Sequence, residues 1–330
     1  MPGKRAVVST CSYEARKYGV HSAMPSLQAQ KLCPNGIFIP GNMELYAKVS
    51  RQVMAILREY SPAMRQCSID EASLDMTGTQ RLFGPPRELA MKIKQRVKDE
   101  IGITMSIGIA TSPFIAKMAS DYNKPDGLCA VSPGKEQVFI DAIGLGKIWG
   151  IGKSGKKTLE EHRITTTQQA RSYSLDQLKL MLGDSFGEYL YEACRGIDPG
   201  TMVQKAKSHS ISSETTFVED ITDEETLHQV LLSMSHELMG RSIDEGIIGR
   251  TVGLKLRWGD FRTITVQDSP DDPILNATTI YAIAKKLLAS KWKPGQGIRL
   301  IGLGLYNTYE GDKPFQDNLF FEDEHKKRKM

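Results

Sequence analysis

Two adjacent acidic residues, Asp70 and Glu71, are the residues whose types most directly suggest chemistry. They lie inside the run 68–75, in which apolar residues alternate and which is therefore expected to form a β-strand. Carboxylates near a core are costly unless water, a cation or hydrogen-bond donors surround them. A divalent metal would remove that cost, because Mg²⁺ takes one or two protein carboxylates and completes its shell with water and substrate phosphates. A strand end that reaches solvent would also explain the pair, so both interpretations stay open at this point.

Two further segments carry side chains suited to phosphate. The run 8–20 is expected to pass from a strand into a helical turn that places Tyr13 and Arg16 three residues apart on one face. A guanidinium and a phenol hydroxyl are good partners for phosphate oxygens, although an ordinary exposed helix would carry the same residues. Lys124 is followed by the letters P-D-G, a turn that gives the lysine a defined direction. It too could reach a phosphate, or it could simply solvate the end of a helix dipole.

Helices and short strands alternate around the acidic pair. Apolar residues at helical spacing predict one helix over 42–60 and a second over 86–101. An alternating strand is expected at 105–109, and a third helix at 113–122. This order predicts an α+β layer in which the helices pack on one face of a sheet.

The second half of the chain has a different organisation. Between about 141 and 200 the pattern is helical with glycine punctuation, which predicts a separate small helical unit. Residues 201–208 lack periodicity and are expected to be a linker. Beyond them the pattern has the order βαββαβ, which is typical of the ferredoxin-like arrangement. Those six elements are expected at 210–217, 223–242, 250–258, 262–267, 273–290 and 298–306.

Composition limits the class of protein. The chain has 330 residues, enough for about two to four domains. Its 40% hydrophobic and 25% charged residues are typical of a soluble globular protein. No run approaches the roughly 18 apolar residues of a membrane span, and no secretory h-region opens the sequence. Five scattered cysteines form no C-x-x-C pair, which favours a reducing cytoplasm. The net charge of +4 permits a polyanionic partner without requiring one.

The wording and order of four motifs point to a known family. They read V-S-T-C-S-Y-E-A-R-K-Y-G-V-H-S-A-M-P, S-I-D-E-A-S-L-D, S-I-G-I-A-T-S-P-F-I-A-K-M-A-S-D and N-K-P-D-G. In this order they resemble the motifs of Y-family translesion DNA polymerases, and most closely those of the bacterial DNA polymerase IV type. The resemblance covers nearly the whole chain.

The resemblance implies a multidomain right-hand polymerase of the α+β class. Its ferredoxin-like palm would lack the first strand, its thumb would be helical, and its little finger would have the βαββαβ order. The implied activity is template-directed, error-prone translesion synthesis, a nucleotidyltransferase reaction that belongs to DNA repair. The expected parts are fingers at 1–42, palm at 43–133, thumb with a helix-hairpin-helix at 134–200, linker at 201–208, little finger at 209–308 and a flexible tail at 309–330.

The family's site residues can be carried over motif by motif. Asp70 would bind metal, and Glu71, in the same metal site, would be the catalytic carboxylate. The family's chemistry uses two Mg²⁺ ions, which stabilise the attacking and leaving oxygens while a primer 3′-hydroxyl attacks the α-phosphate. The residues implied to hold the incoming deoxynucleoside triphosphate are Thr10, Tyr13, Arg16 and Lys124.

The sequence departs from the family's pattern at its start. The family's first strand supplies another metal-binding Asp and, shortly after it, an aromatic residue that excludes ribonucleotides, and neither is present. Asp75 cannot readily substitute, because four strand residues would place it roughly 13 Å from Glu71. We therefore hypothesise a 5′-truncated gene or a fragment, which is expected to extend primers poorly or not at all.

Residues 150–155 match the pattern G-x-G-x-x-G, which has two interpretations. A dinucleotide-binding loop should follow a buried strand, but the preceding segment 143–149 is short and rich in glycine. The family resemblance instead implies a helix-hairpin-helix. In that motif the turn with Gly150 and Gly152 presents backbone N–H groups to a DNA phosphate, and Lys153 lies nearby. We favour the helix-hairpin-helix.

Two more segments are expected to contact partners. Lys255 and Arg257 alternate with apolar residues, so one face of their strand is basic. Such a face suits a duplex backbone, although it could also be an ordinary solvated face. In the tail, residues 316–321 resemble the Q-x-x-L-F peptide that bacterial polymerases insert into the sliding clamp, where exposed aromatics would act as an apolar anchor. The expected clamp-binding residues are Gln316, Leu319 and Phe320.

The sequence thus predicts a DNA-directed DNA polymerase that is monomeric and cytoplasmic. Its expected partners are primer-template DNA, deoxynucleoside triphosphates and the sliding clamp, with no membrane partner. Low fidelity and a mutator character are implied by the family's small fingers. Two rivals stay open. One is a non-catalytic DNA- and clamp-binding protein of the same fold, which the missing strand favours. The other is a metal-dependent nucleotide cyclase, against which the thumb and little-finger pattern argues.

Overall fold

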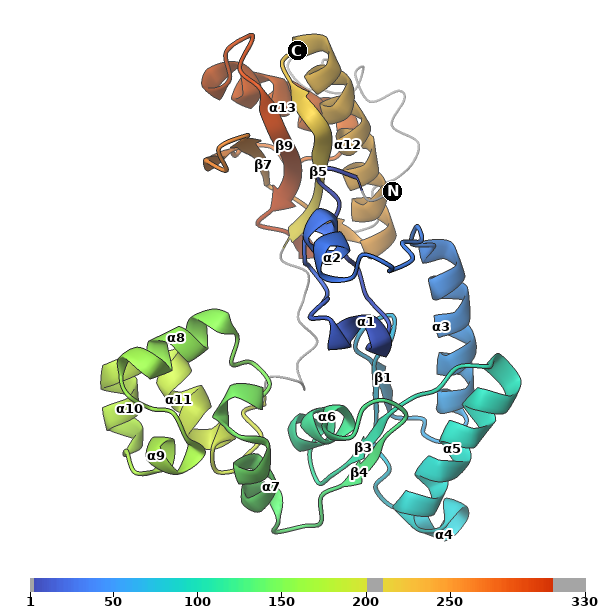
Figure 1. Cartoon of the computed structure of the whole chain (residues 1–330). Helices are drawn as coiled ribbons and strands as arrows, with labels where there is room; N and C mark the ends of the chain where they lie inside the picture. Colours follow the sequence, from blue (N-terminus) through green and yellow to red (C-terminus); the bar gives the residue numbers. More distant parts are fainter. Residues whose placement is uncertain (1–2, 201–209, 311–330) are drawn as a thin grey trace, which may run out of the picture. The chain divides into compact units, whose positions relative to one another are not determined.

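The structure is a computed structural model that describes residues 3–200 and 210–310, and it divides the chain into two compact units (Figure 1). Of the described residues, the first unit comprises 3–38 and 210–310, and the second comprises 39–200. Each unit contains its own clusters of buried apolar side chains. The packing within each unit therefore accounts for its own helices and strands.

The second unit opens with two long amphipathic helices, α3 (Met43–Arg58) and α5 (Pro86–Ile101). The Asn42 side chain caps α3 by accepting a hydrogen bond from the Leu45 N–H at 3.0 Å. Helix α5 begins at a proline and ends at a left-handed glycine. A short helix, α4 (Gln80–Phe83), separates them along the chain. The sequence predicts both long helices correctly, and the buried residues they contribute to one core are Met54, Leu57, Leu89 and Ile93.

Four short strands accompany these helices. Strands β1 (Met64–Gln66) and β2 (Ala72–Leu74) pair antiparallel. Strands β3 (Ile107–Ile109) and β4 (Leu128–Ala130) pair parallel, and the helix α6 (Pro113–Tyr122) connects them. Helix α6 has its predicted bounds, whereas the strand predicted at 105–109 is shorter. The two pairs belong to separate two-stranded sheets rather than to one.

The remainder of the second unit is helical, as the sequence predicts, although its first helix begins slightly earlier than predicted. Two of its helices start with capping boxes. The side chains of Thr166 and Ser174 each accept a hydrogen bond from a backbone N–H in the first turn, and the side-chain oxygens of Gln169 and Gln177 each accept one from the backbone N–H of the cap residue. The elements are α7 (Glu136–Ile143), the 3₁₀ helix η1 (Leu145–Lys147), α8 (Lys153–Glu161), α9 (Thr167–Arg171), α10 (Leu175–Leu182) and α11 (Asp184–Ala193).

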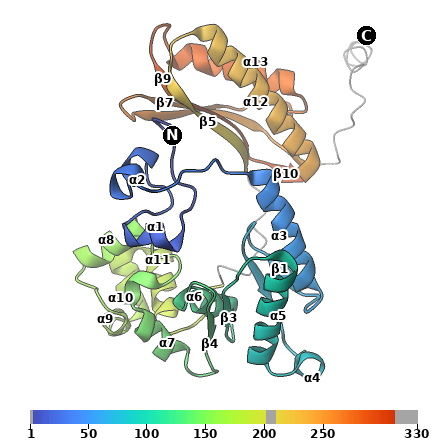
Figure 2. The ribbon, with the colours of Figure 1, turned by 45° about the vertical axis from the view of Figure 1, so that its right-hand side comes forward.

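A four-stranded antiparallel sheet forms most of the first unit. Its strands, in their order across the sheet, are β5 (Ser210–Ile221), β9 (Ile298–Tyr306), β7 (Thr251–Trp258) and β8 (Thr263–Asp268). Two helices, α12 (Glu224–Glu245) and α13 (Ala277–Lys291), cover one face of it (Figure 2). Each strand-helix-strand crossover spans one inserted strand, so the βαββαβ arrangement predicted from the sequence is confirmed. A second, two-stranded ladder pairs β6 (Ile247–Ile248) with β10 (Tyr309–Glu310).

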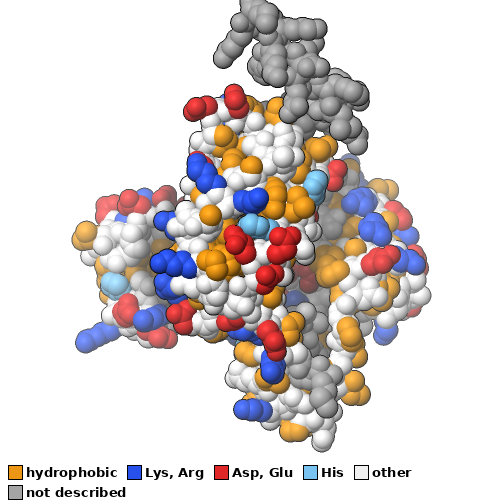
Figure 3. All heavy atoms as spheres, turned by 90° about the horizontal axis from the view of Figure 1, so that it is seen from above, with side chains coloured by type: hydrophobic (Ala, Val, Ile, Leu, Met, Phe, Trp, Pro, Cys, Tyr) orange, Lys and Arg blue, Asp and Glu red, His pale blue; other side chains and the backbone are white. Residues whose placement is uncertain are grey.

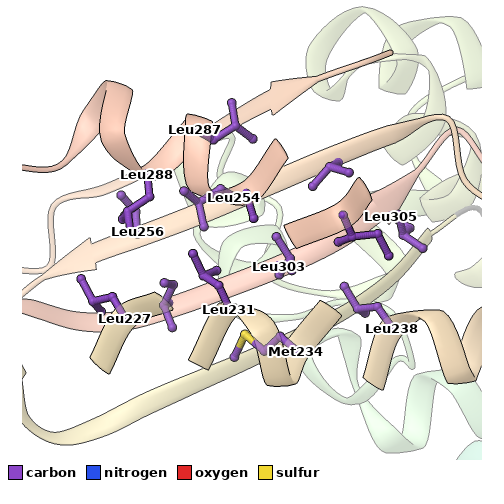
Figure 4. Close-up of a cluster of buried hydrophobic side chains, with 14 of the residues drawn as sticks. Leu227, Leu231, Met234, Leu238, Leu254, Leu256, Leu287, Leu288, Leu303 and Leu305 are labelled. Carbon is purple, nitrogen blue, oxygen red and sulfur yellow. The ribbon is translucent and has the colours of Figure 1, made fainter. Parts of the chain in front are cut away.

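The core of this unit lies between the sheet and its two helices (Figure 4). Alternate residues of β7 point toward the helices, as the two-residue period of a strand requires, and Leu254 and Leu256 are fully buried there. Helix α12 contributes Leu227, Leu231 and Leu238, which are also fully buried. Burial of one leucine side chain stabilises the fold by about 1.5–3 kcal/mol, so this layer holds the sheet in place.

The N-terminal segment of the first unit has little regular structure. It contains two short helices, α1 (Tyr13–Lys17) and α2 (Ser26–Leu32). Val20, Met24 and Ala29 are buried together beneath them. This small cluster is the apolar support for the residues around α1.

No helix within residues 3–200 and 210–310 is both long enough and apolar enough to cross a bilayer. All five cysteines lie in the described part of the chain, and each is a free thiol.

Candidate functional site

The acidic pair lies in the turn between β1 and β2, directly before β2, and not inside a strand as the sequence predicts. The N–H groups of Cys67 and Ser68 donate to the Glu71 carbonyl oxygen at 2.8 and 3.2 Å, and these bonds close the turn. Asp70 is exposed, and its Oδ1 accepts a hydrogen bond from the Ser68 hydroxyl at 2.6 Å. The turn keeps both carboxylates accessible to water, which avoids the desolvation cost of a strand interior.

Glu71 stands at one end of a row of alternating charges along α6. Its Oε1 lies 2.5 Å from the Lys117 Nζ, which in turn lies 3.4 Å from the Asp121 Oδ2. The Asp121 Oδ1 lies 2.6 Å from the Lys124 Nζ. The row joins two site residues predicted from the sequence, Glu71 and Lys124, through two residues that sequence reasoning missed. The i,i+4 spacing of Lys117 and Asp121 could have indicated their pairing.

The pKa values of the two middle groups follow from their neighbours. Burial alone lowers the pKa of Lys117, but the hydrogen bond to Glu71 and the charge of Asp121 raise it above its usual value. Burial alone raises the pKa of Asp121, but the hydrogen bond from Lys124 and the charge of Lys117 lower it. Both groups therefore stay charged at neutral pH.

Lys124 begins a turn that Lys94 of α5 stabilises through hydrogen bonds and an ion pair. The Lys94 Nζ donates to the carbonyl oxygens of Met105 at 3.0 Å and of Gly127 at 3.1 Å. It also donates to the Asp126 carbonyl oxygen and pairs with the Asp126 Oδ1 at 2.7 Å. The Lys94 side chain is only 14% exposed. One partly buried ammonium thus binds four oxygens around this turn and fixes its shape.

The acidic turn offers carboxylate ligands that could hold a metal ion. In the part of the chain that the structure describes, no three His, Cys, Asp or Glu side chains gather into a metal-binding group. Asp70 and Glu71 offer two oxygen ligands at one accessible turn, and Mg²⁺ needs no more than one or two protein carboxylates. These residues therefore fit an ion that shares its shell with water and a bound nucleotide, rather than an ion caged by protein alone.

The predicted phosphate ligands of the N-terminal segment are exposed around α1. Tyr13 is the first residue of that helix, and Thr10 lies shortly before it. The Arg16 guanidinium carbon lies 5.8 Å from the centre of the Tyr13 ring, so the two side chains share a face as predicted. The first unit thus brings Tyr13 and Arg16 together, and the second unit brings Glu71 and Lys124 into one network.

The G-x-G-x-x-G segment lies in the turn between η1 and α8. Because a 3₁₀ helix rather than a strand precedes it, the dinucleotide-binding interpretation is wrong. Gly150 has φ of +93°, and a Cβ there would lie 2.5 Å from the Tyr189 hydroxyl oxygen, so only glycine fits. Gly152 caps α8, and Lys153 is its first residue and is exposed.

The two predicted basic residues of β7 differ in their surroundings. The Lys255 Nζ pairs with both carboxylate oxygens of Glu214, at 2.8 and 3.0 Å. The Arg257 Nε donates to the Thr263 hydroxyl at 2.8 Å, and no carboxylate among the described residues pairs with this guanidinium. Figure 3 shows basic and acidic side chains interspersed on the face it presents, not gathered in one basic patch. Arg257 therefore keeps a free charge, whereas Lys255 is largely neutralised.

The predicted clamp-binding residues Gln316, Leu319 and Phe320 lie outside the described residues, and so does the predicted linker 201–208.

The architecture matches solved polymerase structures. A Y-family DNA polymerase chimera, Dbh-Dpo4(243-245)-Dbh, has a TM-score of 0.77 and 25% identity, covering 93% of this chain and 89% of that chain. An insertion ternary complex of Dbh DNA polymerase has a TM-score of 0.61 and 25% identity, covering 92% and 88%. The fold is therefore that of a Y-family DNA polymerase.

Sequence comparison gives the family. Residues 1–121 match the impB/mucB/samB family, residues 208–319 match its C-terminal domain, and residues 146–198 match the thumb domain of DNA polymerase-iota. DNA polymerase IV of Treponema denticola is 40% identical over 329 residues, which cover 99% of this chain and 83% of that protein. DNA polymerase IV of Listeria monocytogenes is 40% identical over 306 residues, covering 93% and 86%. The chain belongs to the impB/mucB/samB family.

Proposed function

We propose that the chain is a DNA-directed DNA polymerase that adds deoxynucleotides to a primer end in error-prone translesion synthesis. The observation that carries this proposal is the 40% identity to a DNA polymerase IV across 99% of the chain. A similar solved structure is described as an insertion ternary complex of a DNA polymerase, which supports DNA and a nucleotide as partners. Neither observation favours the non-catalytic alternative of the same fold, and the matched thumb and C-terminal domains argue against a nucleotide cyclase.

The domain assignment is part of the proposal. The match to a polymerase thumb over 146–198 supports a thumb at 134–200, and the C-terminal match over 208–319 supports a little finger at 209–308. The fingers are proposed at 1–42 and the palm at 43–133, where the acidic turn and the row of charges lie.

The proposed reaction is a phosphoryl transfer. The primer 3′-oxygen attacks the α-phosphate, a P–O bond forms, the bond to the bridging oxygen breaks and pyrophosphate leaves. Glu71 is the proposed catalytic carboxylate, and Lys117 holds its Oε1 in place. Y-family polymerases generally depend on metal, and we propose Mg²⁺ because Asp70 and Glu71 are hard oxygen ligands. When bound, the ion would stabilise negative charge on the phosphate oxygens.

The nucleotide's phosphates need cationic and hydroxyl donors. Thr10, Tyr13 and Arg16 are proposed to donate from the fingers, where all three side chains are exposed. Lys124 is proposed to donate from the palm. Its ammonium has three N–H donors, so it can keep its bond to Asp121 and still donate to a phosphate oxygen.

The DNA contacts proposed are sequence-independent. The Gly150–Gly152 turn would donate backbone N–H groups to one phosphate with Lys153 close by, and Arg257 would contact another phosphate.

We also propose a monomer that acts in the bacterial cytoplasm and binds the sliding clamp through Gln316, Leu319 and Phe320. Deletion of residues 316–321 is expected to abolish capture of the chain by immobilised clamp.

Primer extension tests the catalytic proposal. The full chain is mixed with a primer-template, deoxynucleoside triphosphates and Mg²⁺, and incorporation opposite each template base is followed on a gel. Glu71→Gln is expected to lower the rate at least about 100-fold, the usual loss when a catalytic carboxylate is removed. Asp75→Asn is the matched control, because Asp75 is an exposed carboxylate whose Oδ1 accepts a bond from the neighbouring Thr77 N–H at 2.9 Å.

The outcomes separate the alternatives. Equal rates for the wild type and Glu71→Gln would remove Glu71 from the chemistry. Tight DNA binding without any extension by the wild type would favour the non-catalytic alternative. The absolute rate also tests the expectation from the sequence that this chain extends primers poorly, and rapid full-length extension would contradict it.

A further inference from the structure

The hairpin between β7 and β8 has an unusual residue at its tip. The Trp258 N–H donates to the Arg262 carbonyl oxygen at 3.0 Å, and the Phe261 N–H donates to the Trp258 carbonyl oxygen at 3.0 Å, which closes a loop over residues 259–261. In such loops the last residue adopts the left-handed conformation and is usually glycine. Here it is Phe261, with φ of +66° and 64% of its surface exposed. A bulky apolar residue is unfavourable there both for its backbone and for its exposure.

A second backbone irregularity aims an arginine at this ring. The register between β7 and β9 shifts between Arg257 and Trp258, so that Arg299 of β9 has no partner opposite it in the ladder. A bulge of this kind redirects a side chain. The Arg299 guanidinium carbon lies 4.5 Å from the centre of the Phe261 ring. One face of the ring is thus covered by a cation, while much of the ring remains exposed.

The charge around the hairpin tip is positive. A second guanidinium, that of Arg262, lies 4.2 Å from the centre of the Trp258 ring. Within residues 3–200 and 210–310, neither Arg262 nor Arg299 forms an ion pair. The nearby carboxylates have other partners: Asp260 accepts the Arg262 backbone N–H at 2.9 Å, and Asp220 pairs with Arg5 at 2.6 Å.

We propose that Phe261 and Arg299 form a stacking platform for an unpaired base of single-stranded DNA, with Arg262 and Arg299 close to the adjoining phosphates. The inference rests on the proposed function, because a polymerase copies a template strand that is single-stranded ahead of the primer end. Aromatic rings flanked by arginines bind single strands of any sequence, since every base has a π face. An apolar protein partner would instead have to desolvate the two guanidinium groups without compensation.

The platform can be tested with a primer-template that has a 5′ template overhang. A 2-aminopurine in the overhang reports base stacking through its fluorescence. The full chain is titrated into this DNA and into a blunt duplex of the same length, and binding is measured by anisotropy. In Phe261→Gly the hairpin gains the residue that its left-handed position prefers, so the thermal midpoint is expected to be unchanged or higher. Affinity for the overhang DNA is expected to fall roughly tenfold, with unchanged affinity for the blunt duplex and no change in 2-aminopurine fluorescence on binding.

Three further variants make the outcome specific. Phe261→Leu keeps the backbone strain and an apolar side chain but loses the π face, so it is expected to bind the overhang as weakly as Phe261→Gly. Phe261→Trp is expected to bind like the wild type. Leu232→Ala is the control, because Leu232 is an exposed apolar residue, 41% accessible, on α12.

Wild-type affinity for the overhang in Phe261→Gly or Phe261→Leu would overturn the platform. Wild-type protein that binds blunt duplex but shows no preference for the overhang would also overturn it and leave the proposed function standing, whereas failure to bind either DNA would contradict the proposed function itself.

Discussion

The Glu71 carboxylate has to meet two conflicting requirements. It must hold its direction in an accessible turn, and it must remain free to meet a divalent ion. Lys117 serves the first requirement, because its ammonium lies 2.5 Å from the Glu71 Oε1 and its side chain is only 16% exposed. The same ammonium opposes the second, since a positive charge at this distance repels an incoming cation. Lys117 and a metal ion therefore compete for Glu71.

This competition predicts that Lys117→Met binds divalent ions more tightly. Removal of the ammonium frees the Glu71 Oε1 and deletes one positive charge beside it, so Mn²⁺ affinity is expected to rise about three- to tenfold. Isothermal titration with Mn²⁺ in the presence of nucleotide and DNA measures it. Lys92→Met is the matched control, because Lys92 is an exposed lysine of α5 that does not pair with Glu71. Equal Mn²⁺ affinities in the wild type and Lys117→Met would show that the ammonium does not compete.

The residues of a candidate site are easier to recognise from the sequence than the residues that hold them in position. Asp70 and Glu71 could be singled out because adjacent carboxylates are costly near a core, and Lys124 because a rigid turn follows it. Lys117 could not be linked to Glu71, because the two are 46 positions apart in the sequence and meet only when α6 packs beside the acidic turn. Lys94 likewise reaches the Asp126 turn across 32 positions. Such contacts depend on tertiary packing, which a local pattern does not contain.

At the scale of elements, the turn after α6 depends on one side chain from α5. Lys94→Met would leave carbonyl oxygens of Met105, Asp126 and Gly127 without their charged donor. We expect a loss of about 2–3 kcal/mol in the free energy of unfolding and faster amide hydrogen exchange over residues 125–128. Urea denaturation and exchange followed by mass spectrometry measure the two effects.

Lys98→Met provides the comparison for this variant. Lys98 lies in the last turn of α5, is exposed, and adds only a more distant charge near Asp126. It is expected to change stability by less than about 0.5 kcal/mol and to leave exchange at the turn unaltered. If both variants exchange like the wild type, the turn holds its shape without Lys94.

In the helical part of the second unit, a pH-dependent ion pair joins α7 and α9. The Arg171 Nη1 and Nη2 donate to the Asp141 Oδ1 and Oδ2 at 2.7 and 2.8 Å, and the Thr167 hydroxyl adds a third bond. The hydrogen bonds from Arg171 hold the pKa of Asp141 below its usual value, against the opposing effect of burial. Since the folded state favours the ionised form, stability from this group is present above the unfolded pKa of about 3.9 and is lost as pH falls through the lower folded value.

Asp141→Asn is therefore expected to cost about 2 kcal/mol of unfolding free energy at pH 7. The difference from the wild type should shrink as the pH drops below about 4. Urea titrations at pH 7, 5 and 3.5 measure it, with Asp176→Asn as the control because Asp176 is exposed in the first turn of α10. A cost that stays constant down to pH 3.5 would mean that the Asp141 charge contributes nothing.

Elements with a strong period could be predicted closely. Helix α6 and strand β9 have the bounds that the sequence predicts, because a serine cap and a proline mark the start of α6 and buried residues fill both faces of β9. The run around the acidic pair misled the prediction, since its alternation continues through a turn that backbone hydrogen bonds to Glu71 close. The platform at Phe261 was also beyond the sequence, because it requires a hairpin tip on one strand and a bulge on another to coincide.

At the scale of the whole molecule, the net charge of +4 understates the capacity for DNA, because position decides which cations are available. Lys255 and Arg257 point from the same strand, yet the first faces Glu214 and the second does not. A lysine that already has a carboxylate partner must exchange that partner for a phosphate, whereas an unpaired arginine releases a counterion from the DNA at no such cost.

The salt dependence of duplex binding is expected to separate these two residues. A plot of the logarithm of affinity against that of salt concentration should lose about 0.9 of its slope in Arg257→Gln, which corresponds to one phosphate contact. Lys255→Met should change the slope much less, because Glu214 neutralises Lys255 at 2.8 Å. Lys285→Met, on the exposed side of α13, is the control and should leave the slope unaltered. An equal reduction of the slope in Lys255→Met and Arg257→Gln would contradict this expectation. It would mean that Glu214 releases Lys255 when DNA binds, so that the ion pairs of the free protein do not determine which cationic side chains contact the duplex.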